Sequence, residues 1–417
     1  MKKRILFVIP DYNKTSLRLV QPFLNKGFTV DLAVPFRFHW YIRLFIFLFP
    51  GSSFIKKLKR RLDDYIKYVD PRCDLITVSF FRLLRIIVRD KLNKRFFLSN
   101  SFKTLIEGQV IKKVKFKEYD LIFTFDTCAL IYLYAARKAG VRTIMELRGN
   151  LIDHSLSVNS RLNEDFGLKL DTPGSYSTDP DKVQWYGKLR DELSYTDNVL
   201  IYSNYQERQL QNINFSKENI YKIPISSPFS SKVRIKKTSG AVNFIYVGNL
   251  SYAKGSGYLL RAWESIARSG KLNGTLTLVG KPFPEFMHEL NRLPENVHYK
   301  GFLFHQQLVN ELEAAHVFIM PSCNDSYGVV VAEALAYNMP VICSPNVGAS
   351  DLIKIRETGL IYKDAFSTED LREAILYFME NTSDVERIST NISKMELDIS
   401  RAAEIQAAEK EISRLIT

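Results

Sequence analysis

The chain has 417 residues, of which 46% are hydrophobic and 25% are charged, and its formal net charge is +13. The length exceeds one ordinary core, so two domains are expected, and the composition excludes wholesale disorder. Residues 1–120 hold 26 Lys and Arg against 10 Asp and Glu. The basic excess therefore lies wholly in this first part, which predicts an anionic partner for it.

The first half of the chain contains six short runs of β-branched and aromatic residues, each followed by a helical stretch. Apolar runs that alternate with helices predict a parallel sheet covered on both faces. The predicted strands are 5–10, 29–35, 74–80, 120–126, 143–147 and 198–203. The first run is too short to be the apolar core of a signal peptide, so we expect it to form the first strand.

Two segments of the first half combine cations with aromatic and aliphatic residues. Residues 36–62 contain seven Lys and Arg and no acidic residue, and residues 80–97 space arginines at helical intervals. An apolar face that enters the acyl boundary, beside cations that meet anionic headgroups, is typical of an interfacial segment. We therefore expect both segments to dock on an anionic membrane surface.

Two other interpretations of these segments stay open. The aromatic residues can belong to the core with the cations as a solvated rim, or the segments can bind nucleic acid. No zinc finger, helix-turn-helix or RNP-like signature accompanies the charge, so no nucleic-acid partner is expected.

Location is predicted from apolar length and cysteine spacing. The most apolar run, 40–49, is shorter than the ~20 residues of a spanning helix. The four cysteines lie far apart without a C-x-x-C pair, at positions Cys73, Cys128, Cys323 and Cys343. This spacing is typical of reduced thiols. We expect a cytoplasmic protein, peripheral on the inner face of the cell membrane.

Polar side chains follow two predicted strands of the first half. Asp126 ends one strand, Arg148 follows the next, and His154 lies shortly after. Because open α/β sheets bind ligands outside the carboxyl ends of their strands, these residues are candidates for a ligand site, with Asp126 as a catalytic group. A lone histidine is also typical of a loop or core position. The Asp-x-Asp at 179–181 lies in a polar loop, so no metal site is predicted there.

A stretch rich in Ser, Pro and Lys, residues 223–240, predicts a domain boundary. Behind it lie five more predicted strands, 242–248, 275–280, 296–301, 317–322 and 340–344. The expected fold class is α/β, with two doubly wound Rossmann-like domains facing across a cleft. We expect residues 1–228 to form the first domain and residues 229–395 the second, with 396–417 as a C-terminal helix that packs back on the first.

The stretch 321–353 carries the most specific pattern of the second half: an apolar strand, a polar loop, and an apolar helix opened by Gly328. Unpaired N–H groups at a helix N-terminus suit an anion such as a diphosphate. Asp325 in the loop and Glu333 in the helix can face one cleft, where a ribose diol would satisfy the Glu333 carboxylate. The alternative is a helix cap for Asp325 and a buried ion pair for Glu333.

A second glycine-containing turn follows the first strand of this half. Gly248-Asn249 end that strand, and Lys254 with Gly255 precede the next helix. Glycines in a turn and a lysine at a helix start predict a diphosphate cradle in which Lys254 is a point charge. The spacing differs from G-x-x-x-x-G-K-[ST], so no P-loop is predicted.

In this order the motifs resemble the retaining GT-B glycosyltransferases of family 4 (group 1). VGNLSYAKG is similar to that family's V-G-R-L-x-x-x-K-G element, and NDSYGVVVAEA to its Glu-x7-Glu motif. NMPVICSPNVGASDLI resembles its G-x-P-V-I-x-S-x-x-G-x-x-E-x-I segment. The resemblance covers roughly residues 242–375. It implies the GT-B architecture, in which residues 1–228 would be the acceptor-binding domain and residues 229–395 the donor-binding domain. Asp126, Arg148 and His154 would then lie on the acceptor side.

The resemblance also implies roles for the matching positions. Asp325 and Lys254 would be catalytic, with Lys254 on the donor diphosphate and Glu333 on the ribose. The donor-binding residues that it implies are Gly248, Asn249, Lys254, Gly280, Ser326, Tyr327, Gly328, Val329, Val330 and Glu333. The sequence departs from the family at Asn249, where arginine is usual, and at Asp325 and Asp351, where glutamate is usual.

The implied reaction moves a sugar from a nucleotide diphosphate sugar to an acceptor hydroxyl with retention, without a metal or another cofactor. A lipid-linked glycan in surface-polysaccharide synthesis is the expected acceptor. Two alternatives remain open: a nucleotide-sugar epimerase on the same architecture, and a non-catalytic membrane- or glycan-binding protein derived from a transferase.

Overall fold

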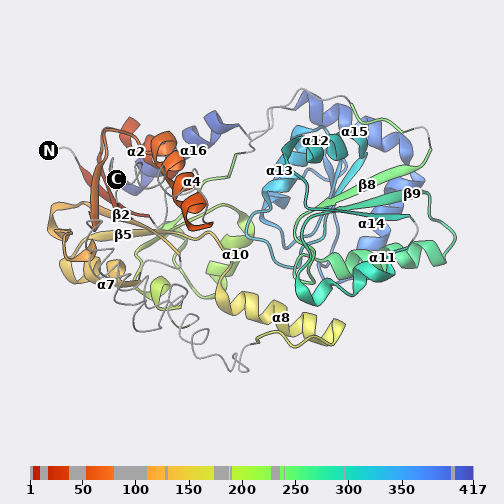
Figure 1. Cartoon of the computed structure of the whole chain (residues 1–417), viewed down its shortest axis with the longest axis horizontal. Helices are drawn as coiled ribbons and strands as arrows, with labels where there is room; N and C mark the ends of the chain where they lie inside the picture. Colours follow the sequence, from red (N-terminus) through yellow and green to blue (C-terminus); the bar gives the residue numbers. More distant parts are fainter. Residues whose placement is uncertain are drawn as a thin grey trace.

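The computed structural model of the chain describes residues 3–9, 17–36, 53–78, 110–126, 130–172, 187, 190–226, 235–238, 240–294, 296–395 and 400–416. Its two lobes are each built on one parallel sheet (Figure 1). The fold class expected from the alternation of strands and helices, two parallel-sheet α/β domains, is confirmed.

The first sheet has seven strands in the order β3-β2-β1-β4-β5-β6-β7, and all pairings are parallel. The strands are β1 (Arg4–Val8), β2 (Thr29–Phe36), β3 (Asp74–Val78), β4 (Leu121–Phe125), β5 (Arg142–Glu146), β6 (Asn198–Ile201) and β7 (Ile220–Lys222). The strand order reverses between β1 and β4, and such a switch point favours ligand binding at the carboxyl edge. Between these strands the rings of Phe7 and Phe123 stack with centroids 4.4 Å apart.

The α-helices of the first domain are α2 (Val20–Asn25), α4 (Ser53–Tyr68), α7 (Leu130–Ala139), α8 (Ile152–Phe166) and α10 (Asn204–Asn212). α10 begins where the Ser203 side chain accepts a hydrogen bond from the Gln206 backbone N–H, which is an N-cap. α8 ends at Gly167, whose φ of 66° lies in the left-handed region that glycine tolerates. In Figure 1, α8 runs from the first lobe toward the second.

The second sheet has six strands in the order β10-β9-β8-β11-β12-β13, again all parallel. They are β8 (Val242–Val247), β9 (Gly274–Val279), β10 (Val297–Gly301), β11 (Val317–Met320), β12 (Val341–Cys343) and β13 (Gly359–Ile361). The α-helices of this domain are α11 (Ser256–Arg268), α12 (His305–Ala314), α13 (Val329–Ala336), α14 (Thr368–Glu380) and α15 (Thr382–Lys394). The short 3-10 helices of the chain are η1 (Phe116–Glu118), η2 (Lys217–Asn219), η3 (Pro284–Phe286), η4 (Glu289–Arg292) and η5 (Gly348–Leu352).

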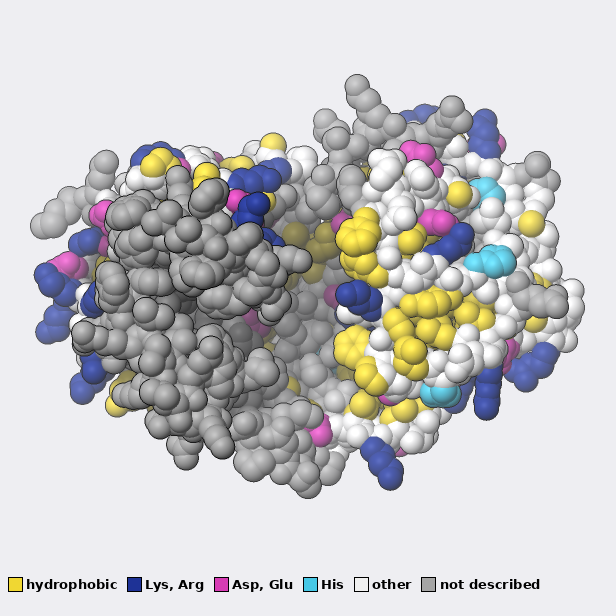
Figure 2. All heavy atoms as spheres, in the orientation of Figure 1, with side chains coloured by type: hydrophobic (Ala, Val, Ile, Leu, Met, Phe, Trp, Pro, Cys, Tyr) yellow, Lys and Arg dark blue, Asp and Glu magenta, His cyan; other side chains and the backbone are white. Residues whose placement is uncertain are grey.

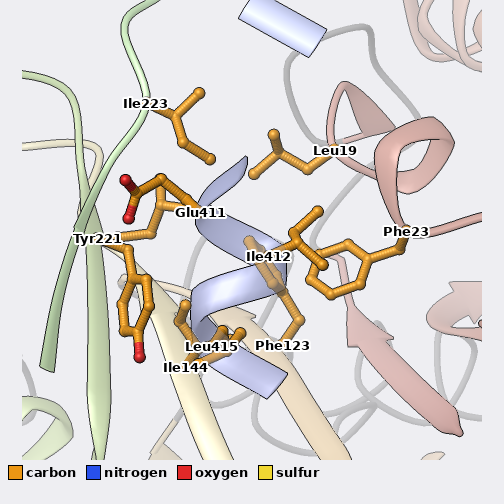
Figure 3. Close-up of a pocket in the computed structure, with 10 residues that line it drawn as sticks. Leu19, Phe23, Phe123, Ile144, Tyr221, Ile223, Glu411, Ile412 and Leu415 are labelled. Carbon is orange, nitrogen blue, oxygen red and sulfur yellow. The ribbon is translucent and has the colours of Figure 1, made fainter. Parts of the chain in front are cut away.

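The last helix, α16 (Arg401–Ile416), packs against α2 and β7 of the first domain. Figure 3 shows an apolar crevice beneath it, lined by Phe23, Phe123, Ile412 and Leu415 among others. Arg18 at the start of α2 ties this region together, because it donates to Glu146 at 2.9 Å and to Glu404 of α16 at 2.5 Å. These buried partners hold the C-terminal helix on the first domain, since removal of one member of a buried ion pair typically costs about 3–5 kcal/mol.

Two strands are absent from the expectations drawn from the sequence. β7 and β13 have three residues each, too few for a pattern of alternation to develop, and they form the outer positions of their sheets.

Most of the basic segments 36–62 and 80–97 lies outside the described residues, with the exception of Phe36 and residues 53–62 at the start of α4. No helix in the described parts of the chain has the length and hydropathy needed to cross a bilayer.

Candidate active site

The centre of the candidate site is an ion pair between two loops of the second domain. The Lys254 Nζ lies 2.6 Å from Asp325 Oδ2. Lys254 precedes α11, and Asp325 lies between β11 and α13, at the carboxyl edge of the sheet. The Lys254 side chain is 33% exposed and that of Asp325 is 14% exposed, so the pair is accessible to a ligand. The structure thus brings together Lys254 and Asp325, two of the three residues predicted to be catalytic; the third, Asp126, lies in the first domain.

The turn that carries Lys254 is pressed against the end of β11. Gly255 has a φ of 73°, and a Cβ there would lie 1.9 Å from the Pro321 carbonyl oxygen. Any other residue would push the turn away from the strand, because a Cβ cannot approach a backbone atom so closely. The glycine therefore fixes Lys254 within reach of the loop that holds Asp325.

The first turn of α13 supplies backbone donors beside this pair. Gly328 is the N-cap residue, with a φ of 81°, and its Cβ position lies 2.8 Å from Val347 Cγ1. Val329 and Val330 follow it and are half-buried. Because they lie in the first turn of the helix, their backbone N–H groups have no partner within the helix. An ammonium group and the positive end of a helix dipole suit a diphosphate.

Glu333 lies one turn further along α13 and is half-buried. Burial raises the pKa of its carboxyl group above the ordinary value. Within the described part of the chain, no hydrogen bond or ion pair involves the carboxyl group of the Glu333 side chain. A half-buried carboxylate of this kind needs a polar partner, and the hydroxyl groups of a ribose have the required chemistry.

Gly248 and Gly280, two of the predicted donor-binding residues, lie at neighbouring strand ends. A Cβ on Gly280, whose φ is 143°, would be 1.8 Å from the Gly248 carbonyl oxygen. The turns after β8 and β9 are therefore in direct backbone contact. Asn249 is held in the turn after β8 through its backbone. Its carbonyl oxygen accepts a hydrogen bond from the Tyr246 hydroxyl at 2.7 Å.

Exposed aromatic side chains follow β9 and β10, and the motif analysis missed them. Phe283, Phe302 and Phe304 are 46%, 56% and 74% exposed. The Phe302 and Phe304 rings meet edge to face with centroids 5.5 Å apart, and Lys281 Nζ lies 5.1 Å from the centre of the Phe302 ring. Figure 2 shows hydrophobic side chains along the edge of the second domain that faces the first. Exposed aromatic faces at this edge can stack on a nucleobase. The sequence signal that could have identified them is the pair of phenylalanines, Phe302 and Phe304, directly after a strand.

On the first domain, Asp126 and Arg148 lie at the carboxyl ends of β4 and β5. Asp126 Oδ2 accepts the Gly149 backbone N–H at 3.0 Å. Burial raises the pKa of Asp126 to about 6, against the opposing effects of the Gly149 N–H and of Arg148. The Arg148 guanidinium stacks on the Phe125 ring at 3.9 Å.

His154 is engaged at the contact between the domains. Its Nε2 lies 2.6 Å from the Tyr205 hydroxyl, which donates to Asn324 Oδ1 of the second domain at 3.0 Å. Burial lowers the pKa of His154 below the ordinary value, so the neutral ring is favoured. The contacts give His154 a place in the domain interface, while its predicted acceptor role stays a prediction.

The loop around Asp325 is held by the first domain on both sides. The Ser326 hydroxyl donates to the Arg148 carbonyl oxygen at 2.8 Å, and the Ser203 hydroxyl donates to the Ser326 carbonyl oxygen at 2.9 Å. Tyr327 is buried, and its hydroxyl donates to the Ile225 carbonyl oxygen at 3.1 Å. Ser326 and Tyr327, predicted as donor contacts, thus have side chains that join the domains.

The described residues hold no cluster of three His, Cys, Asp or Glu side chains arranged as metal ligands are. The Asp-x-Asp at 179–181 and Cys128 lie outside these residues. Cys73, Cys323 and Cys343 are buried free thiols.

Comparisons with known proteins bear on the same half of the chain. Residues 230–395 match the family model described as Glycosyl transferases group 1. The second domain is therefore similar to the glycosyltransferase group 1 family over nearly its whole length. An uncharacterized glycosyltransferase of Methanocaldococcus jannaschii is 26% identical over 34% of this chain and 38% of its own length. The alpha-D-kanosaminyltransferase of Streptomyces kanamyceticus is 22% identical over 36% of this chain and 40% of its own length. This chain therefore spans about two fifths of each of these two relatives.

Solved structures match the whole chain and show its fold. HepE of Anabaena, in complex with UDP and glucose, has a TM-score of 0.57 and 15% identity, with 99% of both chains covered. The lipopolysaccharide outer core galactosyltransferase WaaB has a TM-score of 0.61 and 14% identity, with 98% of this chain and 99% of that chain covered. The group 1 domain is thus part of a chain with the GT-B fold.

Proposed function

We propose that the protein is a retaining, metal-independent glycosyltransferase that moves a sugar from a nucleoside diphosphate sugar to an acceptor hydroxyl. The observation that carries this proposal is the Lys254–Asp325 pair beside the N-terminus of α13. The group 1 match over the same residues and the UDP bound by the structural relative HepE support it.

The chemistry requires stabilisation of the negative charge that develops on the departing diphosphate. Lys254 and the amides of Val329 and Val330 supply preorganised positive charge, which is the main contribution a protein makes to such a step. The bond between the anomeric carbon and the diphosphate oxygen breaks, and the acceptor oxygen forms the new bond on the same face. The departing phosphate takes the acceptor proton. Asp325 orients the transferred sugar, and Glu333 binds the ribose.

We infer that the acceptor is a glycan carried by a membrane lipid, in the synthesis of a surface polysaccharide. The basic excess of residues 1–120 and the surface of α4 support this part. Lys59, Arg60 and Lys67 of α4 are exposed, and Ile66 is 57% exposed. An apolar side chain among cations suits the interface of an anionic bilayer. A cytoplasmic location on the inner membrane face follows from the same proposal.

The proposal is tested by nucleotide release from a panel of nucleoside diphosphate sugars, with and without a lipid-linked glycan. A transferase releases nucleoside diphosphate rapidly only when the acceptor is present, and the anomeric configuration of the product by NMR reports retention. Isomerisation of the donor without acceptor would instead identify an epimerase, and binding without either reaction would identify a non-catalytic protein. Flotation with phosphatidylglycerol vesicles at low salt tests the membrane part separately.

Glu333→Gln sharpens the assay, because glutamine keeps the size of the side chain and loses its charge. Hydrogen bonds to charged groups are worth about 1.5–3 kcal/mol, so the donor KM should rise roughly tenfold or more with a smaller change in kcat. Since burial raises the pKa of Glu333, protonation should weaken donor binding at a higher pH than for an ordinary glutamate. An unchanged KM would remove Glu333 from the ribose site.

A further inference from the structure

Helix α8 belongs to the first domain by its place in the chain, yet it contacts both segments that carry the catalytic pair. One segment is the loop 322–328, which contains Asp325. The other is the turn 250–257, which contains Lys254. The two ends of α8 make these two contacts separately.

The N-terminal part of α8 holds the loop of Asp325 through the preceding residue. Asn324 Nδ2 donates to the Ser155 hydroxyl of α8 at 3.0 Å. Its Oδ1 accepts Asn150 Nδ2 at 2.5 Å and the Tyr205 hydroxyl at 3.0 Å. All polar atoms of this amide side chain are thus used by the first domain, which leaves the adjacent Asp325 little freedom to shift.

The C-terminal end of α8 holds the turn of Lys254 through aromatic contacts. The ring of Phe166 lies 4.6 Å from that of Tyr252 and 4.8 Å from that of Tyr258, measured between centroids. The Arg261 guanidinium lies 3.9 Å from the centre of the Phe166 ring. A Cβ on Gly257 would lie 2.8 Å from Phe166 Cε1, so the glycine makes room for the ring. Tyr252 and Gly257 lie on either side of Lys254 in the sequence.

Polar contacts fix the same end of the helix. The Tyr258 hydroxyl donates to the Asp165 carboxylate, and Arg261 Nη2 donates to the Asp165 carbonyl oxygen at 3.0 Å. Asn163 binds both backbone polar atoms of Leu170, at 2.8 Å and 3.0 Å, and so folds the following segment back on α8. The end of the helix is therefore held in a defined position on α11.

We propose that α8 is a brace supplied by the acceptor-binding domain, which sets the separation between Lys254 and Asp325 in the donor site. The proposal rests on the proposed function, since it assigns Ser155 and Phe166 as positioning residues for that reaction. An α-helix rises 1.5 Å per residue, so the stretch from Ser155 to Phe166 is a rod of about 16 Å between the two contacts. A rigid rod transmits a displacement at one end to the other.

The expected consequence is kinetic. A misplacement of about 1 Å of a positioning group can cost 10²-fold in rate. Glu333 and Phe302, the residues that we expect to bind the nucleoside, lie outside both segments contacted by α8. Loss of the brace should therefore lower kcat much more than it weakens the binding of the nucleoside diphosphate. A purely structural role for Phe166 would lower thermal stability and leave kcat of the folded protein unchanged.

The test compares Phe166→Ala and Ser155→Ala with Glu164→Ala, an exposed position on the same helix. We expect Phe166→Ala to reduce kcat roughly tenfold and to change the Kd of the released nucleoside diphosphate by less than about threefold. Ser155→Ala should act in the same direction with a smaller effect, Phe166→Leu should recover part of the rate, and Glu164→Ala should behave as the unaltered protein. Equal kcat values for Phe166→Ala and Glu164→Ala would overturn the brace.

Hydrogen–deuterium exchange gives a readout that needs no turnover. If α8 is a brace, Phe166→Ala should accelerate amide exchange in both segments, 250–257 and 322–328. The contacts described for Phe166 lie in the first of these segments and in α11. Faster exchange confined to 250–257 would show a local packing role and would overturn the proposal. Absence of donor turnover by the unaltered chain would count against the proposed function, while the exchange pattern would still decide on the brace.

Discussion

The two domains differ in how their candidate residues are held. In the second domain, the candidate residues lie in short local motifs: Gly255 directly follows Lys254, and Gly328 opens α13 three residues after Asp325. In the first domain, His154 and the Arg148 carbonyl oxygen are engaged by residues more than 50 positions away in sequence. A donor site built from local motifs can therefore be recognised in a sequence, while an acceptor site built from long-range contacts cannot.

The comparison also shows which domain depends on the other. The loop 322–328 carries Asp325, the carboxylate proposed to bind the sugar. Its neighbours in the loop are held by five residues of the first domain, Arg148, Asn150, Ser155, Ser203 and Tyr205. Closure of the domains is thus part of the donor site itself. Water exclusion and alignment of the donor follow from one set of contacts.

The largest effect is expected for Lys254→Met, which keeps much of the side-chain volume and removes the charge. Loss of one preorganised group that stabilises developing negative charge costs about 10²–10³-fold in kcat. The control is Lys271→Met, because Lys271 forms only an exposed ion pair with Glu380. Similar donor turnover in the two variants would mean that the diphosphate does not bind at Lys254. The local motifs of the second domain would then not form the donor site.

An intermediate effect is expected for Phe302→Ala. Base–aromatic stacking is worth about 1–3 kcal/mol by alanine substitution, and because Phe302 is 56% exposed we expect the lower end, a rise in donor KM of about fivefold. kcat should stay close to its original value, since the base takes no part in bond breaking. Tyr134→Ala, at a 55% exposed position in the first domain, is the control; an equal KM in both variants would rule out a base at Phe302.

The predictability of the structure follows the same division. The alternation of apolar runs and helices was sufficient to predict both parallel sheets, because each long strand carries its own pattern. The three-residue strands β7 and β13 carry none, and they form only because their neighbours offer a free sheet edge. The hydrogen bonds of Asn324 and the ring contacts of Phe166 depend on how two domains meet, which no local spacing of residues encodes. The exposed pair Phe302 and Phe304 was visible in the sequence but could not be told from core phenylalanine without the exposed fractions.

The smallest effect concerns Asp126, and it tests whether the acceptor side is a tuned site. Burial raises the pKa of Asp126 to about 6 from an ordinary value of 3.8, while Gly149 and Arg148 oppose the shift and Glu192 and Glu146 add to it. A raised pKa means that the folded state binds the proton more tightly than the unfolded state, so the charged carboxylate destabilises the fold above pH 6.

Asp126→Asn should therefore raise thermal stability at pH 7.5, by on the order of 1 kcal/mol after allowance for partial exposure. The advantage should shrink as the pH falls from 6 toward 4 and disappear at about pH 3, where the carboxyl group is protonated in both the folded and the unfolded protein. Thermal unfolding of both proteins at a series of pH values measures the difference, and asparagine can still accept the Gly149 N–H. If the acceptor kcat/KM of the native enzyme also changes near pH 6, and that change is lost in the variant, Asp126 takes part in acceptor recognition as well. A stability difference that stays constant from pH 4 to 7.5 would mean that Asp126 has an ordinary pKa. The carboxyl end of β4 would then not hold an acid with a raised pKa.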